Sequence, residues 1–177
     1  MISRLRLLGA FVIAIAMIFA VFLTACATKA KGDKAPDFKL ETLDGKTISF
    51  DDIRKDPERK GKTRVLLLDF WATWCPPCME AIPHLQKLQE KYEKKGFTVV
   101  GIAVQSKADK IKDIKKDKKL TYPLLVDSKG TCSREYKVRY LPTTYIIDKE
   151  GKISAVHEGY TKDLEKKLDN EIAALLK

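Results

Sequence analysis

The sequence has 177 residues, and its 34 Lys and Arg against 24 Asp and Glu give a formal net charge of +10. This length suits one domain rather than several, and no repeat or low-complexity tract is present. No known nucleic-acid-binding motif accompanies the basic charge, so we expect no nucleic-acid ligand.

The N-terminal segment has the features of an export signal. Arg4 and Arg6 precede an uncharged apolar run from Leu7 to Leu23, as in a basic region followed by a hydrophobic region. The run ends in Leu23-Thr24-Ala25-Cys26, which resembles the bacterial lipoprotein processing box with Cys26 as the lipidated residue. An uncleaved signal anchor is the alternative, and both place the domain outside the cytoplasm, tethered to a membrane. The expected divisions are a lipoprotein signal peptide over 1–25, a linker over 26–34 and a folded domain over 35–177.

The first half of the domain predicts a hairpin followed by a buried strand. Phe38 to Phe50 alternates apolar and polar residues around Asp44-Gly45, which predicts a β-hairpin. The charged stretch 51–62 predicts a loop or a short turn of helix. The continuous apolar run from Val65 to Phe70 predicts a central strand.

The middle of the chain alternates between helix and strand. The stretch from Cys75 to Lys95 predicts a helix that ends at Gly96 and is kinked at Pro83. Phe97 to Val104 predicts a second buried strand, and Ala108 to Lys119 predicts a helix with a solvated basic face. This alternation indicates parallel strands joined by a right-handed crossover.

The last part of the chain predicts short elements and a closing helix. We expect strands at Pro123–Asp127 and Thr143–Asp148, a short helix at Thr131–Tyr136, and an antiparallel partner strand at Lys152–His157. Thr161 is expected to cap the final amphipathic helix, which carries Leu164, Leu168, Ile172 and Leu175 along one side.

Two cysteines lie where the first buried strand turns into a helix. The first-turn N–H groups of a helix lack internal partners and carry partial positive charge, so they favour a thiolate at Cys75. Cys78 follows one turn later on the same face and can close a disulfide with Cys75. Pro76 and Pro77 suit a first helical turn and stiffen the segment between the sulfurs. The pattern predicts dithiol redox chemistry.

Metal and haem sites fit the sequence poorly. A zinc site needs about four ligands, and the chain has no second closely spaced pair among its four Cys and two His residues. Covalent haem attachment needs His directly after Cys78, where Met79 stands. We therefore expect neither a metal nor a cofactor.

Three segments together resemble the thioredoxin superfamily, in its membrane-tethered TlpA/ResA-like branch. They are Asp69 to Cys78, Leu141-Pro142-Thr143-Thr144 and Tyr145 to Gly151. The resemblance implies an α/β thioredoxin fold, with a mixed central sheet flanked by helices and an N-terminal β-hairpin extension. It also implies an extracytoplasmic thiol–disulfide oxidoreductase that reduces exported proteins, including apocytochromes c. Its partners would be disulfide or dithiol clients and a membrane-embedded thiol donor, and we expect a monomer.

The same resemblance assigns roles to further residues. Asp69, which ends an apolar strand, would take the proton of Cys78; the alternative is an ordinary strand-end carboxylate in water. Leu141 and a cis Pro142 would form the opposite wall of the site, where client peptides dock. Trp74, Pro76 and Pro77 would belong to that docking surface, whereas Trp71 is expected in the core.

Some residues depart from the branch or stay ambiguous. The acidic residue expected three positions after the second cysteine is replaced by Ala81, and Glu80 lies about a hundred degrees away around the helix. Cys132 predicts a small buried side chain, with a third redox thiol as the alternative. His84 and His157 are expected to be ordinary surface or packing residues.

Three other functions compete with disulfide reduction. The opening Ala35-Pro36-Asp37-Phe38 also resembles peroxiredoxins, but Ala72 and Leu68 occupy the positions that need Thr or Ser and Pro in a thiol peroxidase. A copper-delivery protein of this fold would need C-x-x-x-C and a distant His near the site, and this sequence has neither. A structural lipoprotein whose Cys75–Cys78 bond never turns over is the third alternative.

Overall fold

The computed structural model describes residues 29–55 and 62–177. The predicted signal peptide, Cys26 and the start of the linker lie outside these residues. Within the described ranges, no helix combines the length and apolar character needed to cross a membrane.

Seven strands form one mixed sheet in the order β2-β1-β5-β4-β3-β6-β7. Strands β3, β4 and β5 are parallel, while β6, β7 and the β1–β2 hairpin pair antiparallel. The predicted hairpin thus extends the sheet at β5, and the expected mixed sheet is confirmed. The strands are β1 Lys39–Thr42, β2 Thr47–Ser49, β3 Val65–Trp71, β4 Phe97–Val104, β5 Leu124–Asp127, β6 Thr143–Ile147 and β7 Ile153–Glu158.

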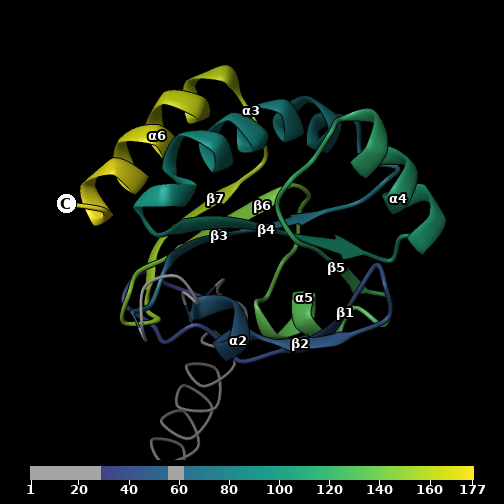
Figure 1. Ribbon diagram of the computed structural model, residues 1–177, viewed down its shortest axis with the longest axis horizontal. Helices are drawn as coiled ribbons and strands as arrows, with labels where there is room; N and C mark the ends of the chain where they lie inside the picture. Colours follow the sequence, from purple (N-terminus) through teal and green to yellow (C-terminus); the bar gives the residue numbers. More distant parts are fainter. Residues whose placement is uncertain (1–28, 56–61) are drawn as a thin grey trace, which may run out of the picture.

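Helices cover both faces of the sheet. Figure 1 shows α3 (Pro76–Tyr92), α4 (Ala108–Asp117) and α6 (Lys162–Leu175) on one face, and α2 (Phe50–Arg54) and α5 (Thr131–Glu135) on the other. The order β3–β4–β5 runs in one direction across the sheet, so its right-handed crossovers place α3 and α4 on the same side.

The central strand β3 supplies both halves of the core. All seven of its residues are buried, and because side chains alternate along a strand they divide between the two faces. Leu67 and Trp71 pack under α3 and α6, whereas Leu68 and Phe70 pack with the aromatic cluster on the hairpin side. Asp69 is the exception, since it is a buried carboxylate among apolar residues, on the face that α3 and α6 cover.

Several helix ends differ from the sequence predictions, and α4 and α5 end one or two residues early, at Asp117 and Glu135. Helix α3 begins after Cys75 and runs through Pro83 to Tyr92; a 3₁₀ turn, η2 (Glu93–Lys95), then leads to Gly96, whose φ of 89° is left-handed. Thr161 occupies the N-cap position of α6, as predicted, but its side chain makes no cap hydrogen bond. The stretch 51–62, expected as a loop or a short turn of helix, starts with the short helix α2, which has a capping box between Ser49 and Asp52.

Candidate active site

The cysteine pair sits at the junction of β3 and α3, as the sequence predicts. Cys75 is the N-cap of α3, and its Sγ accepts a hydrogen bond of 3.3 Å from the Cys78 backbone N–H. The Cys75 N–H in turn donates to the Ala72 carbonyl at 3.2 Å. The two sulfurs form a disulfide, and the Cα atoms are 5.3 Å apart. The structure therefore shows the oxidised form of the pair.

Accessibility and charge distinguish the two cysteines. Cys75 is 5% exposed and Cys78 is fully buried. The first turn of α3 contains no acidic residue, and prolines occupy its first two positions. The Cys78 N–H, which donates to the Cys75 sulfur, and the helix dipole therefore act on that sulfur without an opposing charge. This arrangement favours Cys75 as the attacking thiolate and Cys78 as the second sulfur.

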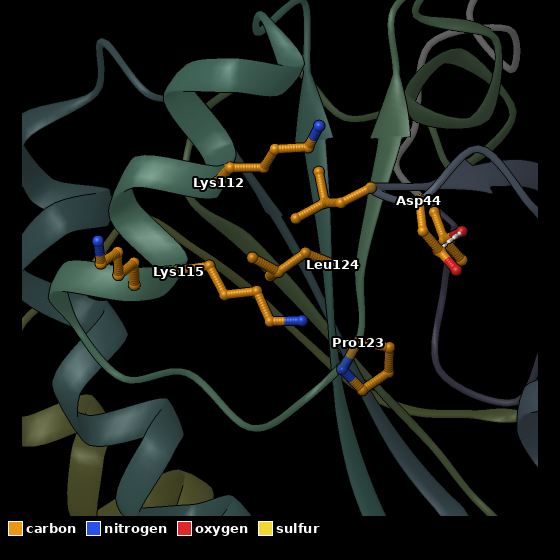
Figure 2. A pocket seen from close by; sticks show the side chains of 8 residues that line it. Asp44, Lys112, Lys115, Pro123 and Leu124 are labelled. Carbon is orange, nitrogen blue, oxygen red and sulfur yellow. Dashed lines mark hydrogen bonds between the residues drawn. The ribbon is translucent and has the colours of Figure 1, made fainter.

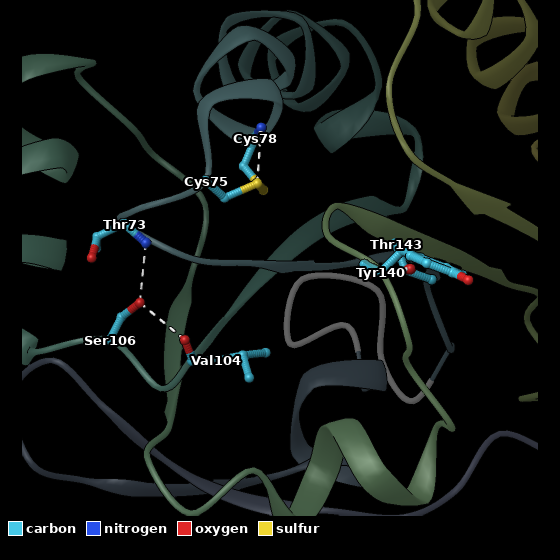
Figure 3. The surroundings of a disulfide bond; sticks show 7 residues. All are labelled: Thr73, Cys75, Cys78, Val104, Ser106, Tyr140 and Thr143. Carbon is cyan, nitrogen blue, oxygen red and sulfur yellow. Dashed lines mark hydrogen bonds between the residues drawn. A yellow bond between two sulfur atoms is a disulfide. The ribbon is translucent and has the colours of Figure 1, made fainter.

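Ser106 holds the loop that precedes Cys75. The Thr73 N–H donates to Ser106 Oγ at 3.0 Å, and the Ser106 hydroxyl donates to the Val104 carbonyl at 3.0 Å (Figure 3). These bonds fasten the loop to the end of β4. The neighbouring Gln105 has a left-handed φ of 46°, a conformation that side chains other than Gly and Asn rarely adopt. Sequence reasoning missed Ser106 because only the fold brings β4 to this loop.

A groove of about 470 Å³ opens beside Cys75. Two of its lining side chains, Trp74 and Tyr140, are each 63% exposed, which is unusual for large aromatics. The Leu141–Pro142 peptide bond is cis, as the resemblance implied, and Leu141 forms part of the wall. The groove is lined by Trp74, Cys75, Pro76, Pro77, Val104, Gln105, Ser133, Val138, Arg139, Tyr140 and Leu141.

Most of the predicted docking residues line this groove. It brings Trp74, Pro76, Pro77 and Leu141 together around Cys75, while Pro142 lies buried behind the wall. Tyr140 was missed at the sequence level, although an aromatic residue directly before Leu141-Pro142 was an available signal.

Asp69 is buried on the sheet face whose core cluster includes Cys75 and Cys78, and it is not a solvated strand-end carboxylate. Its residue is 1% exposed, and burial raises the pKa of its carboxyl to about 7. Among the described residues, its Oδ1 atom has no hydrogen-bond partner. In the sheet it pairs with Gly101 on β4 and Thr144 on β6. A carboxyl that titrates near neutrality can exchange a proton with a thiol.

Cys132 lies on the opposite side of the sheet. It is buried as a free thiol on α5, and burial raises its pKa above the usual range. Its thiol therefore stays protonated, as the prediction of a small buried side chain requires.

The remaining polar candidates do not join the site. Glu80 is exposed on α3 while Ala81 is buried. The histidines pack against α6, where His84 Nδ1 lies 3.5 Å from Glu165 and His157 Nε2 lies 2.7 Å from Glu171. The described part of the chain brings together no group of three or more His, Cys, Asp or Glu side chains that could hold a metal.

A second pocket, of about 550 Å³, lies between α4 and the hairpin (Figure 2). Its floor is apolar, and its rim carries surface lysines and one hairpin carboxylate. None of its lining residues is a cysteine, so the dithiol chemistry belongs to the groove at Cys75. The lining residues are Thr42, Leu43, Asp44, Lys112, Lys115, Lys116, Pro123 and Leu124.

Known proteins share this arrangement. Residues 31–156 match the AhpC/TSA family. The chain is 40% identical to the thioredoxin-like protein YneN of Bacillus subtilis, over 78% of this chain and 79% of that protein. It is 33% identical to the thiol-disulfide oxidoreductase ResA of Geobacillus thermodenitrificans, over 80% and 77%.

A solved structure agrees with these relatives. The crystal structure of a putative thiol:disulfide interchange protein DsbE from Chlorobium tepidum superimposes with a TM-score of 0.76 at 33% identity, covering 85% of this chain and all of that one. The thioredoxin-like fold predicted from the sequence is thereby confirmed. The chain belongs to the AhpC/TSA family and is a thiol–disulfide oxidoreductase of the ResA/DsbE type, with Cys75 and Cys78 as its cysteine pair.

Proposed function

We propose that this protein reduces disulfides of exported proteins, with apocytochromes c among the clients. The observation that carries the proposal is the Cys75 sulfur at the helix N-terminus, beside an open groove. The two relatives named as oxidoreductase and interchange protein support dithiol chemistry. The reducing direction and the choice of client come from the resemblance to the membrane-tethered branch.

The reaction has two thiol–disulfide exchanges. The Cys75 thiolate attacks a client sulfur, forming a mixed disulfide and releasing the other client sulfur as a thiolate. Cys78 then gives its proton to Asp69 and attacks the Cys75 sulfur, which releases the client and forms the Cys75–Cys78 disulfide. Two electrons pass from the enzyme dithiol to the client disulfide.

Clients dock in the groove beside Cys75. The exposed rings of Trp74 and Tyr140 offer apolar area in the groove that Cys75 also lines, and aromatic residues of this kind commonly anchor protein interfaces. The Leu141 backbone, before the cis bond to Pro142, is placed to pair with an extended client segment. Docking through backbone and apolar contacts suits a reductase with several clients.

The protein acts outside the cytoplasm as a membrane-anchored monomer. Residues 1–25 serve as a signal peptide, Cys26 carries lipid, and residues 26–34 link the anchor to the domain over 35–177. A membrane-embedded thiol donor returns the pair to the dithiol state, because disulfides persist outside the cytosol. Radiolabelled palmitate incorporation that disappears in Cys26→Ser tests the anchor, and labelling retained in that variant contradicts it.

Insulin-disulfide reduction tests the function. We expect wild-type protein to reduce insulin in the presence of a thiol donor, and Cys75→Ser to lose all turnover because no attacking sulfur remains. Cys78→Ser should stall as a mixed disulfide with the client, visible on non-reducing gels and by mass spectrometry. Cys132→Ser is the matched control and should retain wild-type turnover, since Cys132 is buried on the other side of the sheet.

The same variants separate the competing functions. Peroxide consumption exceeding insulin reduction would indicate a thiol peroxidase, and copper binding that needs Cys75 and Cys78 without turnover would indicate a delivery protein. A structural lipoprotein would show neither activity. The reduction potential of the Cys75–Cys78 couple decides the direction: we expect a strongly negative value, and a potential near that of oxidising folding catalysts contradicts the reductase.

A further inference from the structure

A row of residues crosses four strands on the sheet face that α3 and α6 cover. Gly101 on β4 pairs with Asp69 on β3, Asp69 pairs with Thr144 on β6, and Thr144 pairs with His157 on β7. Directly paired residues of neighbouring strands point to the same face, with Cβ atoms about 5 Å apart in antiparallel pairs. The polar side chains therefore lie side by side, from the centre of the sheet to its β7 edge.

The two ends of this row differ. At Gly101, an added Cβ would lie 2.5 Å from Leu124, 3.1 Å from the Trp71 indole nitrogen and 3.4 Å from Tyr122, so side chains fill this end. At the other end, the side chain of His157 is 10% exposed and that of its hydrogen-bond partner Glu171 is 28% exposed. The row is closed inside the protein and reaches water beside α6.

Two neighbouring atoms in the row lack partners. In the described structure, the buried Asp69 Oδ1 and Thr144 Oγ1 atoms have no hydrogen-bond partner. Buried polar atoms are nearly always hydrogen-bonded, and an unpaired buried carboxylate is costly. The two atoms are not bonded to each other as described, and a rotation of either side chain would let the Thr144 hydroxyl donate to Asp69 or accept from it, because a hydroxyl has one proton and two lone pairs.

The proposed reaction moves a proton at this place. Asp69 receives one proton from Cys78 in each cycle, and it becomes ionised again either by returning this proton when the pair is reduced or by releasing it to solvent. Cys78 is fully buried, and a docked client would cover Cys75, so the dithiol side offers no open route to water. The Gly101 end is closed by packed side chains. Thr144, which pairs with Asp69 on the other side, carries a hydroxyl through which a proton can leave.

On the basis of the proposed function, we propose that Thr144 and His157 carry the proton from Asp69 to solvent at the β7 edge. The Asp69 carboxylic acid gives its proton to Thr144 Oγ1, and the Thr144 hydroxyl passes its own proton toward His157. Glu171 orients the imidazole and accepts the proton at the surface. One proton enters from Cys78, one leaves at the edge, and no electrons move along the row.

Other titratable groups lie on this face. Burial raises the pKa of Tyr122 above its usual range, so Tyr122 stays protonated beside Asp69. Among the described residues, Cys78 of α3 belongs to the core cluster on this face, and Glu171 of α6 bonds to His157. On the covering helices, the further ion pairs are His84 with Glu165 and Lys91 with Asp169.

Thr144→Val tests the relay in the full-length protein, because it removes the hydroxyl and keeps the side-chain shape. In insulin reduction at pH 7 we expect turnover to fall at least about tenfold, within the range typical of lost proton transfer. The acid limb of the pH–rate profile should move to higher pH, since ionised Asp69 loses its donor. Thr144→Ser should restore both the rate and the profile. His157→Gln should slow turnover and increase the solvent deuterium isotope effect.

Two controls separate the relay from a structural role. In a Cys78→Ser background, Thr144→Val should leave the attack of Cys75 on the client unchanged. Thr98→Val removes another buried hydroxyl, which accepts from Arg64 at 3.2 Å on the opposite face, and should leave the pH–rate profile unchanged. A Thr144→Val profile that matches wild type contradicts the relay. So does a uniform loss at every pH that Thr144→Ser does not rescue.

Infrared titration of the Asp69 carboxyl tests the Thr144 contact without turnover. In the oxidised protein, Thr144→Val should move this titration to higher pH, and an unmoved titration contradicts the contact. Wild-type protein that reduces no insulin contradicts the proposed function and, with it, the relay. Wild-type activity with an unaltered Thr144→Val variant contradicts the relay alone.

Discussion

At the scale of single residues, the burial of Asp69 lowers the stability of the fold but gives its carboxyl a pKa suited to proton transfer. A carboxyl buried among apolar side chains is forced toward its neutral form, because desolvation disfavours the charge. Its pKa of about 7 is the result of burial alone. The residue therefore lowers the stability of the fold at neutral pH while it holds a proton acceptor on the same sheet face as the dithiol.

The pH dependence of stability should reveal this cost. Unfolded Asp69 ionises near its ordinary pKa of 3.8, whereas folded Asp69 ionises near 7. The unfolded state thus releases its proton first, and stability falls as pH rises from about 4 to about 7. The loss is about 4 kcal/mol, at 1.36 kcal/mol per pKa unit. Urea unfolding of the oxidised protein at pH 4.5 and pH 8, both chosen as roughly the ends of that window, should show the loss in wild type and not in Asp69→Asn.

An exposed carboxylate provides the comparison for Asp69. Asp109→Asn, in the first turn of α4, alters a solvated side chain and should keep the wild-type pH dependence. Parallel stability curves for wild type and Asp69→Asn would show that the buried carboxyl does not set the dependence.

At the scale of elements, hydrophobic pattern and turn residues predicted most of the fold. The apolar run of β3 predicted the central strand, and Asp44-Gly45 predicted the hairpin. Gly45 adopts the left-handed φ of 80° that such a turn needs. The cysteine pair was predictable because its chemistry depends on residues close in sequence. Thr144 and His157 were not, since their alignment with Asp69 depends on strand register, including an irregularity between Ile146 and Ile147.

Strand β4 is expected to tolerate no side chain at Gly101. Gly101→Ala would place a Cβ 2.5 Å from Leu124 and 3.1 Å from Trp71, so packed neighbours would have to move. Overpacking of this kind costs about 1–3 kcal/mol, which chemical denaturation should detect. Gly32→Ala is a useful comparison, because no atom lies within 4 Å of its added Cβ and only its φ of 94° opposes the change. Wild-type stability in Gly101→Ala would show that the strands can separate to make room.

At the scale of the whole molecule, charge is the dominant surface property. The formal net charge is +10, or 10 − 2 = +8 without Arg4 and Arg6 of the proposed signal peptide, and within α4 only Ile111 is buried. A field of this sign attracts acidic partners over distances beyond direct contact. It contributes to the rate at which clients arrive, whereas the groove decides how they bind.

Client charge should therefore affect the rate of reduction. Two disulfide peptides that differ only in acidic or basic flanking residues provide the measurement. At low ionic strength we expect kcat/KM to be about tenfold higher for the acidic peptide, in the range of electrostatic steering. The difference should nearly vanish at about 1 M salt, where the screening length is about 3 Å. A preference that survives high salt would indicate direct contacts with the peptide charges instead.

The unequal burial of the sulfurs determines how the domain responds to thiol reagents. Of the three cysteines that the structure describes, Cys78 is fully enclosed, Cys132 is 3% exposed and Cys75 alone borders the groove. A reduced domain should accept a single alkyl group per chain under native conditions. For the same reason, covalent dimers through Cys132 should not form, so the domain can stay unlinked among oxidised neighbours.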